Sequence, residues 1–323
     1  VYIMHSNKKI YIAGHSGMVG SAIIRKLERE GYSNLLFRGS AELDLTKQAE
    51  VEDFFEKEKP EVVLVAAAKV GGIQANDKYR AEFLYQNLMI ESNLINTSFL
   101  NKVKKLIFLG SSCIYPKNSP QPIKEEFVLS GYLEPTNEPY SIAKITGIKL
   151  CENYFRQYGV NFFSLMPTNL YGPNDYFNLE RSHVIPALMR KIQEAKMNNI
   201  SEVVLWGTGK ATREFLYVDD LAEAVVFALE NLNAPDIYNL GITQLNIGTG
   251  IEVSINELAE KIKKILKFEG TLIYDTTKPD GMPRRLLDVS RIQSFGWVHK
   301  TSLEQGLMLT YKWFTENYQY IRN

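Results

Sequence analysis

Short apolar runs alternate with longer stretches of helical periodicity over the first half of the chain. This order is typical of βαβ units, in which a helix carries the chain from one parallel strand to the next. Because such units build one sheet with helices on both faces, the pattern predicts an α/β fold of the Rossmann type with a doubly wound parallel sheet. The predicted strands are 9–14, 34–38, 61–68, 104–110 and 160–167, and the predicted helices lie near 18–30, 47–58, 77–100 and 139–158.

The pattern becomes looser after Pro167, where shorter elements indicate a second, smaller α/β lobe. The Rossmann domain is expected to span 1–166 and the smaller domain mainly 167–323, with part of 214–250 returning to the first. A cleft between two such lobes is a frequent place for a ligand. In the second lobe we predict helices near 184–197, 219–231 and 302–318 and a strand at 202–206.

Composition excludes several kinds of partner. The 323 residues include 37 Lys and Arg and 37 Asp and Glu, so no overall charge attracts nucleic acid or a membrane surface. The longest apolar run, 62–68, is far shorter than the ~20 residues of a membrane-spanning helix. Two cysteines provide no disulfide framework, and the opening runs directly into a strand signal, which leaves no signal peptide. We expect a cytoplasmic protein that binds small molecules and no metal.

A glycine-rich turn follows the first predicted strand, in "AGHSGMVGSAIIRKL". An isolated glycine triplet is weak evidence, because any turn can use glycine. Here strand, turn and helix start coincide, so backbone N–H groups and the helix dipole can face a pyrophosphate. We therefore predict a dinucleotide site. Its candidate residues in this part of the chain are Gly14, Gly17, Met18, Val19, Gly20 and Ala67.

The end of the second strand favours NADP over NAD. An NAD site usually carries a carboxylate there for the ribose 2′-hydroxyl, whereas "FRGSAELDL" places Arg38 at this point and no carboxylate before Glu42. An arginine suits a 2′-phosphate, although a solvated arginine at a strand end is the simpler alternative. Asp44 can lie near the adenine or merely mark a helix start, and Leu45 is a further candidate for the cofactor site.

A tyrosine, a lysine and a serine predict the chemistry. Tyr140 and Lys144 are four residues apart at the start of a predicted helix, so both project from one face. A carbonyl reduced by hydride needs a proton, which a phenol supplies if a nearby ammonium stabilises the phenolate. Such a pair alone is more often an exposed helix pair. Ser111, however, ends the fourth strand at the edge of the sheet where ligands bind, and it can hydrogen-bond the same carbonyl.

These motifs resemble the extended short-chain dehydrogenase/reductase family, whose glycine spacing is G-x-x-G-x-x-G. Within it, blocks spread over nearly the whole chain are similar to the GDP-L-fucose synthase family, which epimerises and reduces a GDP-4-keto-6-deoxy sugar. The blocks include "AAAKVGGI", "YQNLMIESNLI", "FLGSSCIYPK", "MPTNLYGP", "REFLYVDDLA" and "KPDGMPRRLLDVS". The resemblance implies NADPH as the cofactor. Ser16 stands where several relatives have an arginine, which removes one candidate contact to the 2′-phosphate.

The resemblance also implies a nucleotide-sugar site. Asn169 and Leu170 would border the nicotinamide and the diphosphate, and Val184, Trp206 and Arg213 would hold GDP. The alternatives are a core position for Trp206 and an ion pair with Glu214 for Arg213. Arg284 and Arg285 are too ambiguous to assign.

Cys113 and His183 are the implied acid–base pair for epimerisation at C3 and C5. Protons at these carbons are acidic beside a C4 ketone, so inversion needs one group to remove a proton and another to deliver one. A thiol and an imidazole can do this near neutral pH. A free cysteine after a strand is usually a buried hydrophobe, and a lone histidine at a helix start is usually structural or capping. His183 is also a candidate cofactor contact.

The expected function is thus NADPH-dependent epimerisation and C4 reduction of a GDP-4-keto-6-deoxy sugar, with GDP-4-keto-6-deoxy-D-mannose converted to GDP-L-fucose as the first choice. One alternative is a C4 reductase, with or without epimerase activity, of a related GDP-keto-sugar such as a GDP-heptose. A distant alternative is a non-catalytic dinucleotide sensor, which would need no Tyr140 proton donor. The resemblance implies a homodimer packed through the helices near 77–100 and 139–158.

Overall fold

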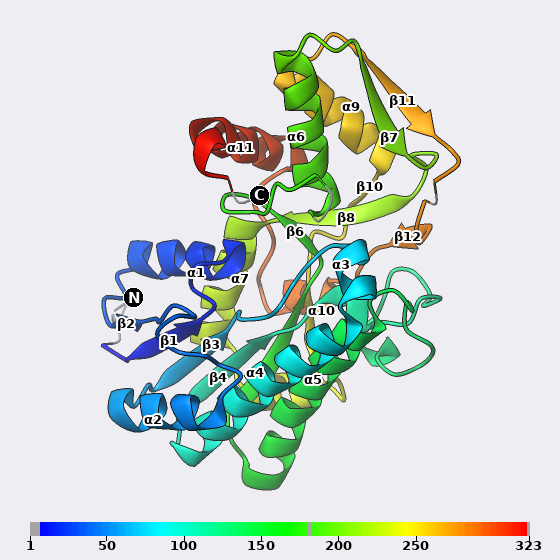
Figure 1. Ribbon diagram of the computed structural model, residues 1–323. Helices are drawn as coiled ribbons and strands as arrows, with labels where there is room; N and C mark the ends of the chain where they lie inside the picture. The colour runs from blue at the N-terminus through cyan, green and yellow to red at the C-terminus, as the bar shows by residue number, and fades with distance from the viewer. Residues whose placement is uncertain (1–6, 180–181, 279, 322–323) are drawn as a thin grey trace.

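The computed structural model describes residues 7–179, 182–278 and 280–321, and it has two lobes (Figure 1). The larger lobe contains a parallel sheet of six strands in the order β2-β1-β3-β4-β5-β9. Most strand residues are buried, because helices cover both faces of the sheet. The Rossmann-type, doubly wound fold is therefore confirmed. The strands are β1 (Ile10–Ala13), β2 (Leu35–Leu36), β3 (Val62–Val65), β4 (Lys105–Leu109), β5 (Phe162–Pro167) and β9 (Leu245–Ile247).

Two groups of helices enclose this sheet (Figure 1). α1 (Met18–Arg29) packs against α7 (Val218–Asn231) on one side. On the other side, α4 (Arg80–Leu100) lies between α2 (Gln48–Glu58) and α5 (Glu138–Tyr158), preceded by the short α3 (Ile73–Lys78). α8 (Ala234–Tyr238) leads into β9. The strands and long helices predicted for the first half of the chain are all present.

The smaller lobe is built around β8 (Thr212–Tyr217). β8 pairs with β6 (Asn169–Tyr171) and β12 (Arg284–Arg285) in parallel and with β10 (Glu252–Ser254) antiparallel, while β7 (Glu202–Trp206) pairs with β11 (Thr271–Asp275). The elements predicted at 184–197, 202–206 and 302–318 are present here, whereas the helix predicted at 219–231 is α7 and packs in the larger lobe. The helices of this lobe are α6 (Val184–Met197), α9 (Ile255–Leu266) and α11 (Leu303–Glu316).

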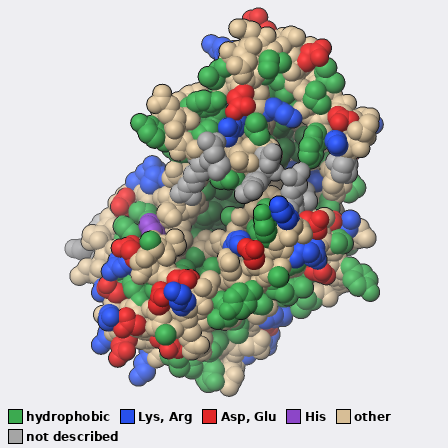
Figure 2. All heavy atoms as spheres, viewed as in Figure 1, with side chains coloured by type: hydrophobic (Ala, Val, Ile, Leu, Met, Phe, Trp, Pro, Cys, Tyr) green, Lys and Arg blue, Asp and Glu red, His purple; other side chains and the backbone are tan. Residues whose placement is uncertain are grey.

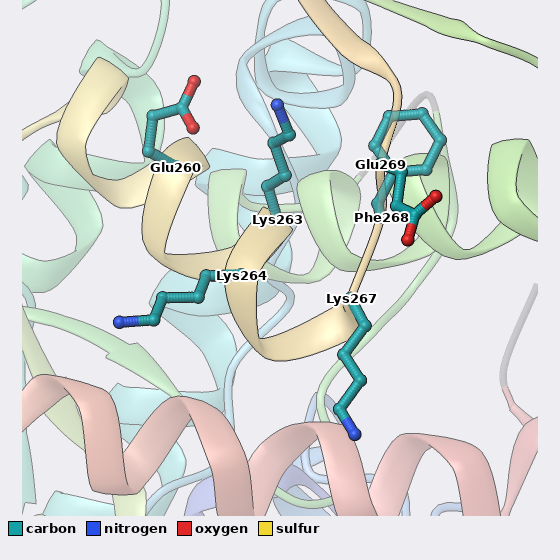
Figure 3. A pocket seen from close by; sticks show the side chains of 6 residues that line it. All are labelled: Glu260, Lys263, Lys264, Lys267, Phe268 and Glu269. Carbon is teal, nitrogen blue, oxygen red and sulfur yellow. The ribbon is translucent and has the colours of Figure 1, made fainter.

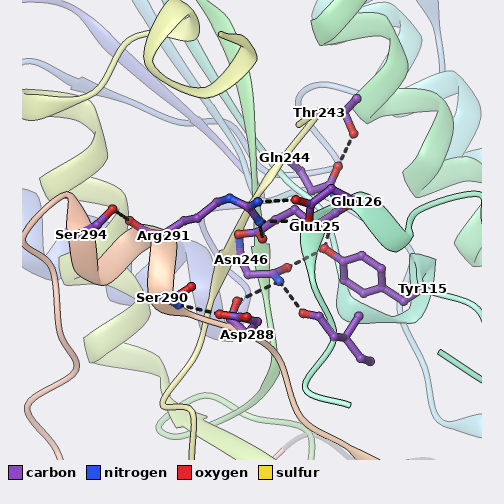
Figure 4. Close-up of polar contacts among 11 residues, drawn as sticks. Tyr115, Glu125, Glu126, Thr243, Gln244, Asn246, Asp288, Ser290, Arg291 and Ser294 are labelled. Atoms are coloured by element: carbon purple, nitrogen blue, oxygen red, sulfur yellow. Dashed lines mark hydrogen bonds and ion pairs between the residues drawn. The ribbon is translucent and has the colours of Figure 1, made fainter. Parts of the chain in front are cut away.

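A buried polar network fixes the segment that follows β4. That segment contains the short helices η1 (Ser112–Ile114) and η2 (Glu125–Phe127). Tyr115 Oη donates to Asn246 Oδ1 at 2.6 Å, and Asn246 Nδ2 donates to the carbonyl oxygens of Ile123 and Asp288 (Figure 4). Arg291, in α10 (Ser290–Ser294), pairs with Glu125. β9 and the C-terminal part of the chain therefore hold the loop that carries the candidate catalytic residues.

In the part of the chain that the structure describes, no helix has the length and apolar character needed to cross a membrane. Cys113 and Cys151 are both buried and free. Among the described residues, no group of three or more His, Cys, Asp or Glu side chains is placed to hold a metal ion. The short helix η3 (Tyr318–Tyr320) follows α11.

Candidate active site

The glycine turn lies where the strand order of the sheet reverses. β1 and β3 are neighbours, and connections leave them in opposite directions, which makes a crevice at their carboxyl ends. Gly14 has a φ of 87°, and a Cβ there would lie 2.6 Å from the Ala67 backbone nitrogen. A Cβ on Gly20 would lie 2.2 Å from the Gly14 carbonyl oxygen. Glycine is thus required at both positions for strand, turn and α1 to meet this closely.

The N-terminus of α1 is shaped to receive an anion. Gly17 is its N-cap residue and donates its backbone N–H to the Gly14 carbonyl oxygen at 3.1 Å. Met18 and Val19 form the first turn, which contains no acidic side chain. Unpaired N–H groups and the helix dipole favour a phosphate at such a point. The residues present therefore fit the pyrophosphate of a dinucleotide.

Arg38 has partners within the protein. One guanidinium nitrogen donates to Glu58 Oε1 at 2.8 Å and another to the Phe37 carbonyl oxygen. A 2′-phosphate at Arg38 would therefore share the guanidinium with Glu58. Asp44 accepts two hydrogen bonds from Thr46 just before α2, and these lower the pKa of its carboxyl. Asp44 thus stabilises the turn before α2 but does not cap that helix, whose N-cap residue is Lys47.

Leu45 lies beside Asp44 and is partly buried against the core. Its carbonyl oxygen accepts a hydrogen bond from Asn93 Nδ2 of α4 at 2.9 Å. This bond fixes the backbone of the loop that precedes α2.

Ser111 and Cys113 occupy the carboxyl end of β4. Ser111 is the N-cap residue of η1, and its hydroxyl oxygen accepts the backbone N–H of Cys113 at 3.5 Å. Ser141 Oγ of α5 donates to the Cys113 carbonyl oxygen at 3.0 Å. That bond ties η1 to the start of α5, where Tyr140 lies. The structure therefore brings the serine, the cysteine and the tyrosine to one edge of the sheet.

Lys144 lies one turn after Tyr140 and is almost fully buried, with 2% of its surface exposed. Its ammonium donates to the Leu109 carbonyl oxygen at 3.1 Å and lies 3.0 Å from Glu91 Oε1 of α4. It is 5.9 Å from the centroid of the Tyr140 ring. Burial, followed by the nearby Cys113 and Glu91, raises the pKa of Tyr140 well above its usual value. The phenol is therefore protonated at neutral pH.

His183 comes from the other lobe, as the N-cap residue of α6. It makes no side-chain capping hydrogen bond, so the capping alternative is not what the structure has. The side chain is open to solvent, yet the surrounding protein desolvates it enough to lower its pKa. A neutral imidazole is thus favoured near pH 7. Val184, the next residue, is partly buried in the core of the smaller lobe.

Both alternatives for the other nucleotide-sugar candidates were wrong. Trp206 is 58% exposed at the end of β7 and is not a core residue. Glu214 does not pair with Arg213, because its buried carboxylate accepts the backbone N–H groups of Thr249, Gly250 and Leu287.

Asn169 lies on β6 next to Leu170 and donates to the Glu214 carbonyl oxygen at 2.9 Å. Arg213 is partly buried on β8, the strand that pairs with β6. The candidates from β6 and β8 thus lie on adjacent strands.

Two charged residues at this edge were missed or left unassigned. Glu91 is fully buried within α4, where a carboxylate among apolar neighbours in "NLMIESNLI" was the available signal. Arg285 is 6% exposed and donates to the Ser112 carbonyl oxygen at 2.7 Å, next to Cys113. Arg284, by contrast, is exposed and pairs with Glu252. The two arginines of the pair thus have different surroundings.

The molecular surface is hollowed between the two lobes (Figure 2). A separate hollow of about 400 Å³ lies on α9. Its lining contains no predicted site residue, and Lys263, Lys264 and Lys267 spread outward from it (Figure 3). We therefore place the candidate site at the carboxyl edge of the parallel sheet and not on α9.

Comparisons with known proteins agree with this geometry. Residues 10–241 match the model of the NAD dependent epimerase/dehydratase family. The chain belongs to this family. It is 56% identical over 309 residues to GDP-L-fucose synthase 1 of Arabidopsis thaliana. That alignment covers 96% of this chain and 94% of the relative. It is 53% identical to the GDP-L-fucose synthase of Escherichia coli, with 97% and 98% covered.

Similar chains are also found among solved structures. The GDP-mannoheptose C4 reductase MlghC of Campylobacter jejuni, with NADP bound, has a TM-score of 0.87 and 43% identity, and 96% of this chain and 98% of that chain are covered. The resemblance to the GDP-L-fucose synthases that the motifs predicted is thus confirmed over nearly the full chain.

Proposed function

We propose that the protein is an NADPH-dependent enzyme that epimerises a GDP-4-keto-6-deoxy sugar at C3 and C5 and reduces it at C4. GDP-4-keto-6-deoxy-D-mannose is the proposed substrate and GDP-L-fucose the product. The observation that carries the proposal is the meeting of Ser111, Cys113 and Tyr140 at one strand end, with Lys144 behind them. The names of the full-length relatives support the choice of sugar.

In the reduction, Tyr140 gives its proton to the C4 oxygen. The raised pKa keeps that proton in place at neutral pH, and the Lys144 ammonium stabilises the phenolate that forms. Ser111 hydrogen-bonds the same oxygen from the end of β4. Bound NADPH supplies the hydride. The glycine turn, with Ala67 opposite, is the proposed cofactor cradle, and Arg38 would reach the 2′-phosphate beside Glu58.

In the epimerisation, Cys113 and His183 exchange protons at C3 and C5. The C4 ketone stabilises the enolate that forms when one group removes a proton, and the other returns a proton to the opposite face. His183 suits the role of the base, since its lowered pKa favours the neutral imidazole, which accepts a proton. The two residues come from different lobes, so a sugar would be bound between the lobes.

The smaller lobe is proposed to hold GDP. Arg213 can bind a diphosphate with two parallel hydrogen bonds, and the exposed Trp206 offers a flat face near a base or ribose. Asn169, Leu170 and Val184 complete the proposed set.

We also propose that the chain divides into a domain spanning 1–166 and a smaller domain. The pairing of β9 with β5 supports the return of 214–250 to the first domain.

A second candidate is a C4 reductase of a GDP-heptose. The similarity to MlghC, a GDP-mannoheptose C4 reductase, favours it. The two candidates differ in the sugar and in whether epimerisation takes place, and they share Tyr140 and Lys144. We further propose a homodimer packed through α4 and α5 and a cytoplasmic location, which the two free cysteines support.

The test is incubation of the protein with NADPH and a panel of GDP-4-keto sugars, with products identified by NMR. Deuterium uptake from D₂O at C3 and C5 is measured before NADPH is added. Uptake followed by GDP-L-fucose formation is the expected result. Reduction without deuterium uptake would instead favour the second candidate, a C4 reductase that does not epimerise its substrate. An equal or higher kcat/KM with NADH would contradict the cofactor assignment.

A further inference from the structure

Lys144 acts in the proposed reduction, whereas Glu91, the buried carboxyl group paired with it, has no role there. Glu91 is 0% exposed and Lys144 is 2% exposed, and their charged atoms are 3.0 Å apart. Lys144 comes from α5 and Glu91 from α4, so the pair joins two different helices. Breaking a buried pair from one side leaves an unpaired charge, which is costly. The contact therefore fixes where the lysine side chain lies between the two helices.

The remaining surroundings of Lys144 cannot replace that carboxylate. The ammonium contacts one carbonyl oxygen, of Leu109, and lies 4.6 Å from the centroid of the Phe108 ring. A carbonyl and an aromatic face attract a cation but carry no net negative charge. Among these contacts, Glu91 is therefore the one that can offer the ammonium a full negative charge.

The absence of a side chain at Gly147 leaves space for the Glu91 carboxylate. A Cβ on Gly147 would lie 2.9 Å from Glu91 Oε2 and 2.5 Å from Phe108 Cζ. Gly147 is in the middle of α5, where glycine costs about 1 kcal/mol relative to alanine. The glycine thus lets α4 approach α5 closely enough for Glu91 to reach Lys144.

We propose that Glu91 is a positioning residue for the C4 reduction, which holds Lys144 protonated and directed toward Tyr140. This inference rests on the proposed function. It assigns Glu91 no contact with the sugar. The titratable groups that face the pair are Tyr140 and Cys151 from α5, and Glu91 helps to raise the pKa of both.

Glu91→Gln is the principal test, because it removes the charge and keeps the size. The neutral amide leaves Lys144 without its counter-ion and takes away one cause of the high Tyr140 pKa. Both effects shift the alkaline limb of the reduction rate to lower pH. We expect kcat for reduction to fall on the order of 10–100-fold. Deuterium uptake at C3 and C5 should stay within about 2-fold, because Cys113 and His183 perform it.

The matched control is Glu152→Gln. Glu152 is a buried carboxylate of α5 with two ion pairs, to Lys149 and Arg156, and lies outside the site. Glu152→Gln should leave the rate of reduction and its pH profile unchanged. Wild-type kcat and pH profile in Glu91→Gln overturn the inference, as does an equal loss of reduction and deuterium uptake, which indicates a structural role.

Two further measurements cover other outcomes. If Glu91→Gln does not fold, Glu91→Asp keeps the charge on a shorter side chain. Glu91→Asp should lower kcat for reduction and leave the alkaline limb of the rate in place, and an unchanged kcat overturns the inference.

A substrate-free readout is ¹⁵N NMR of Lys144 Nζ, assigned with Lys144→Arg. Lys144 should lose its proton at lower pH in Glu91→Gln than in wild type. Identical titrations overturn the inference even where the sugar has been misassigned.

Discussion

At the scale of single residues, desolvation decides which protonation state each candidate brings to the reaction. Burial raises the pKa of Tyr140, and the protein around the solvent-accessible His183 desolvates it enough to lower its pKa, so the phenol keeps its proton and a neutral imidazole is favoured near pH 7. One group is thereby ready to donate a proton and the other to accept one. The same desolvation thus serves two opposite tasks.

Tyr140→Phe should abolish most of the reduction. The variant keeps the ring and loses the proton donor, so kcat should fall on the order of 10²–10⁴-fold while GDP affinity changes little. NADPH oxidation and GDP titration calorimetry measure the two quantities. Tyr132→Phe, at a side chain that is 95% exposed, is the control. Near wild-type reduction by Tyr140→Phe would remove it from the mechanism.

Cys113→Ser should separate the two activities. A serine hydroxyl is a far weaker base than a thiolate, so deuterium uptake at C3 and C5 should be lost while reduction of a suitably configured 4-keto sugar remains. His183→Asn should impair uptake as well. NMR in D₂O with and without NADPH distinguishes the steps. Unchanged uptake in Cys113→Ser would return Cys113 to a packing role.

Sequence reasoning predicted the candidate residues that occur in recognisable motifs, such as Tyr140 and Lys144. It could not predict Glu91, because a carboxylate in a helix is usually solvated and its contact lies 53 residues away on α5. Arg285 was left open for the same reason. The adjacent Arg284 is chemically identical, and only the pairing of β12 with β8 decides which guanidinium is buried.

At the scale of elements, the glycine turn joins β1 to α1 with no room for a larger residue at one point. Gly20→Ala would place a Cβ 2.2 Å from the Gly14 carbonyl oxygen, whereas the nearest atom to a Cβ on Gly17 is 3.5 Å away. Gly20→Ala should therefore lower the stability of the cofactor-free protein by about 1–3 kcal/mol. Urea unfolding of Gly20→Ala and of the control Gly17→Ala measures the two free energies of unfolding. Equal stabilities would contradict the model of the turn.

The long elements were predictable because their apolar periodicity extends over many residues. The short ones were not. β12 is two arginines, and β6 and β10 have three residues each, so they are strands only because β8 pairs with them. α9 was also missed, although Ser254 and Glu257 form a capping box at its start. That motif was the signal that could have identified it.

At the scale of the whole molecule, a buried carboxyl should make stability depend on pH. Asp175 follows β6, and one of its oxygens is buried without a partner. Burial raises its pKa to about 7. The folded protein therefore retains a proton that the unfolded chain releases near pH 4. The stability that the protonated Asp175 contributes is thus complete below about pH 4 and is lost as pH rises through about 7.

Asp175→Asn should remove that dependence. Relative to wild type, the stability of the variant should rise by about 4 kcal/mol as pH increases from about 4 to about 7, and the difference should stay constant above about pH 7. Urea unfolding at a series of pH values measures the gain. Asp53→Asn, at an exposed position, serves as control. Parallel pH profiles for Asp175→Asn and wild type would show that the carboxyl ionises normally.

The position of β9 has a consequence for synthesis on the ribosome. β9 pairs with β5 through Leu245 and Leu165, which are 80 residues apart in the chain. Most of the elements of the smaller lobe that precede β9 emerge during that interval, so the edge of β5 stays uncovered while they are made. Unpaired strand edges are prone to association with other chains. A pause in translation before residue 245 would therefore prolong the most aggregation-prone period of this protein's synthesis.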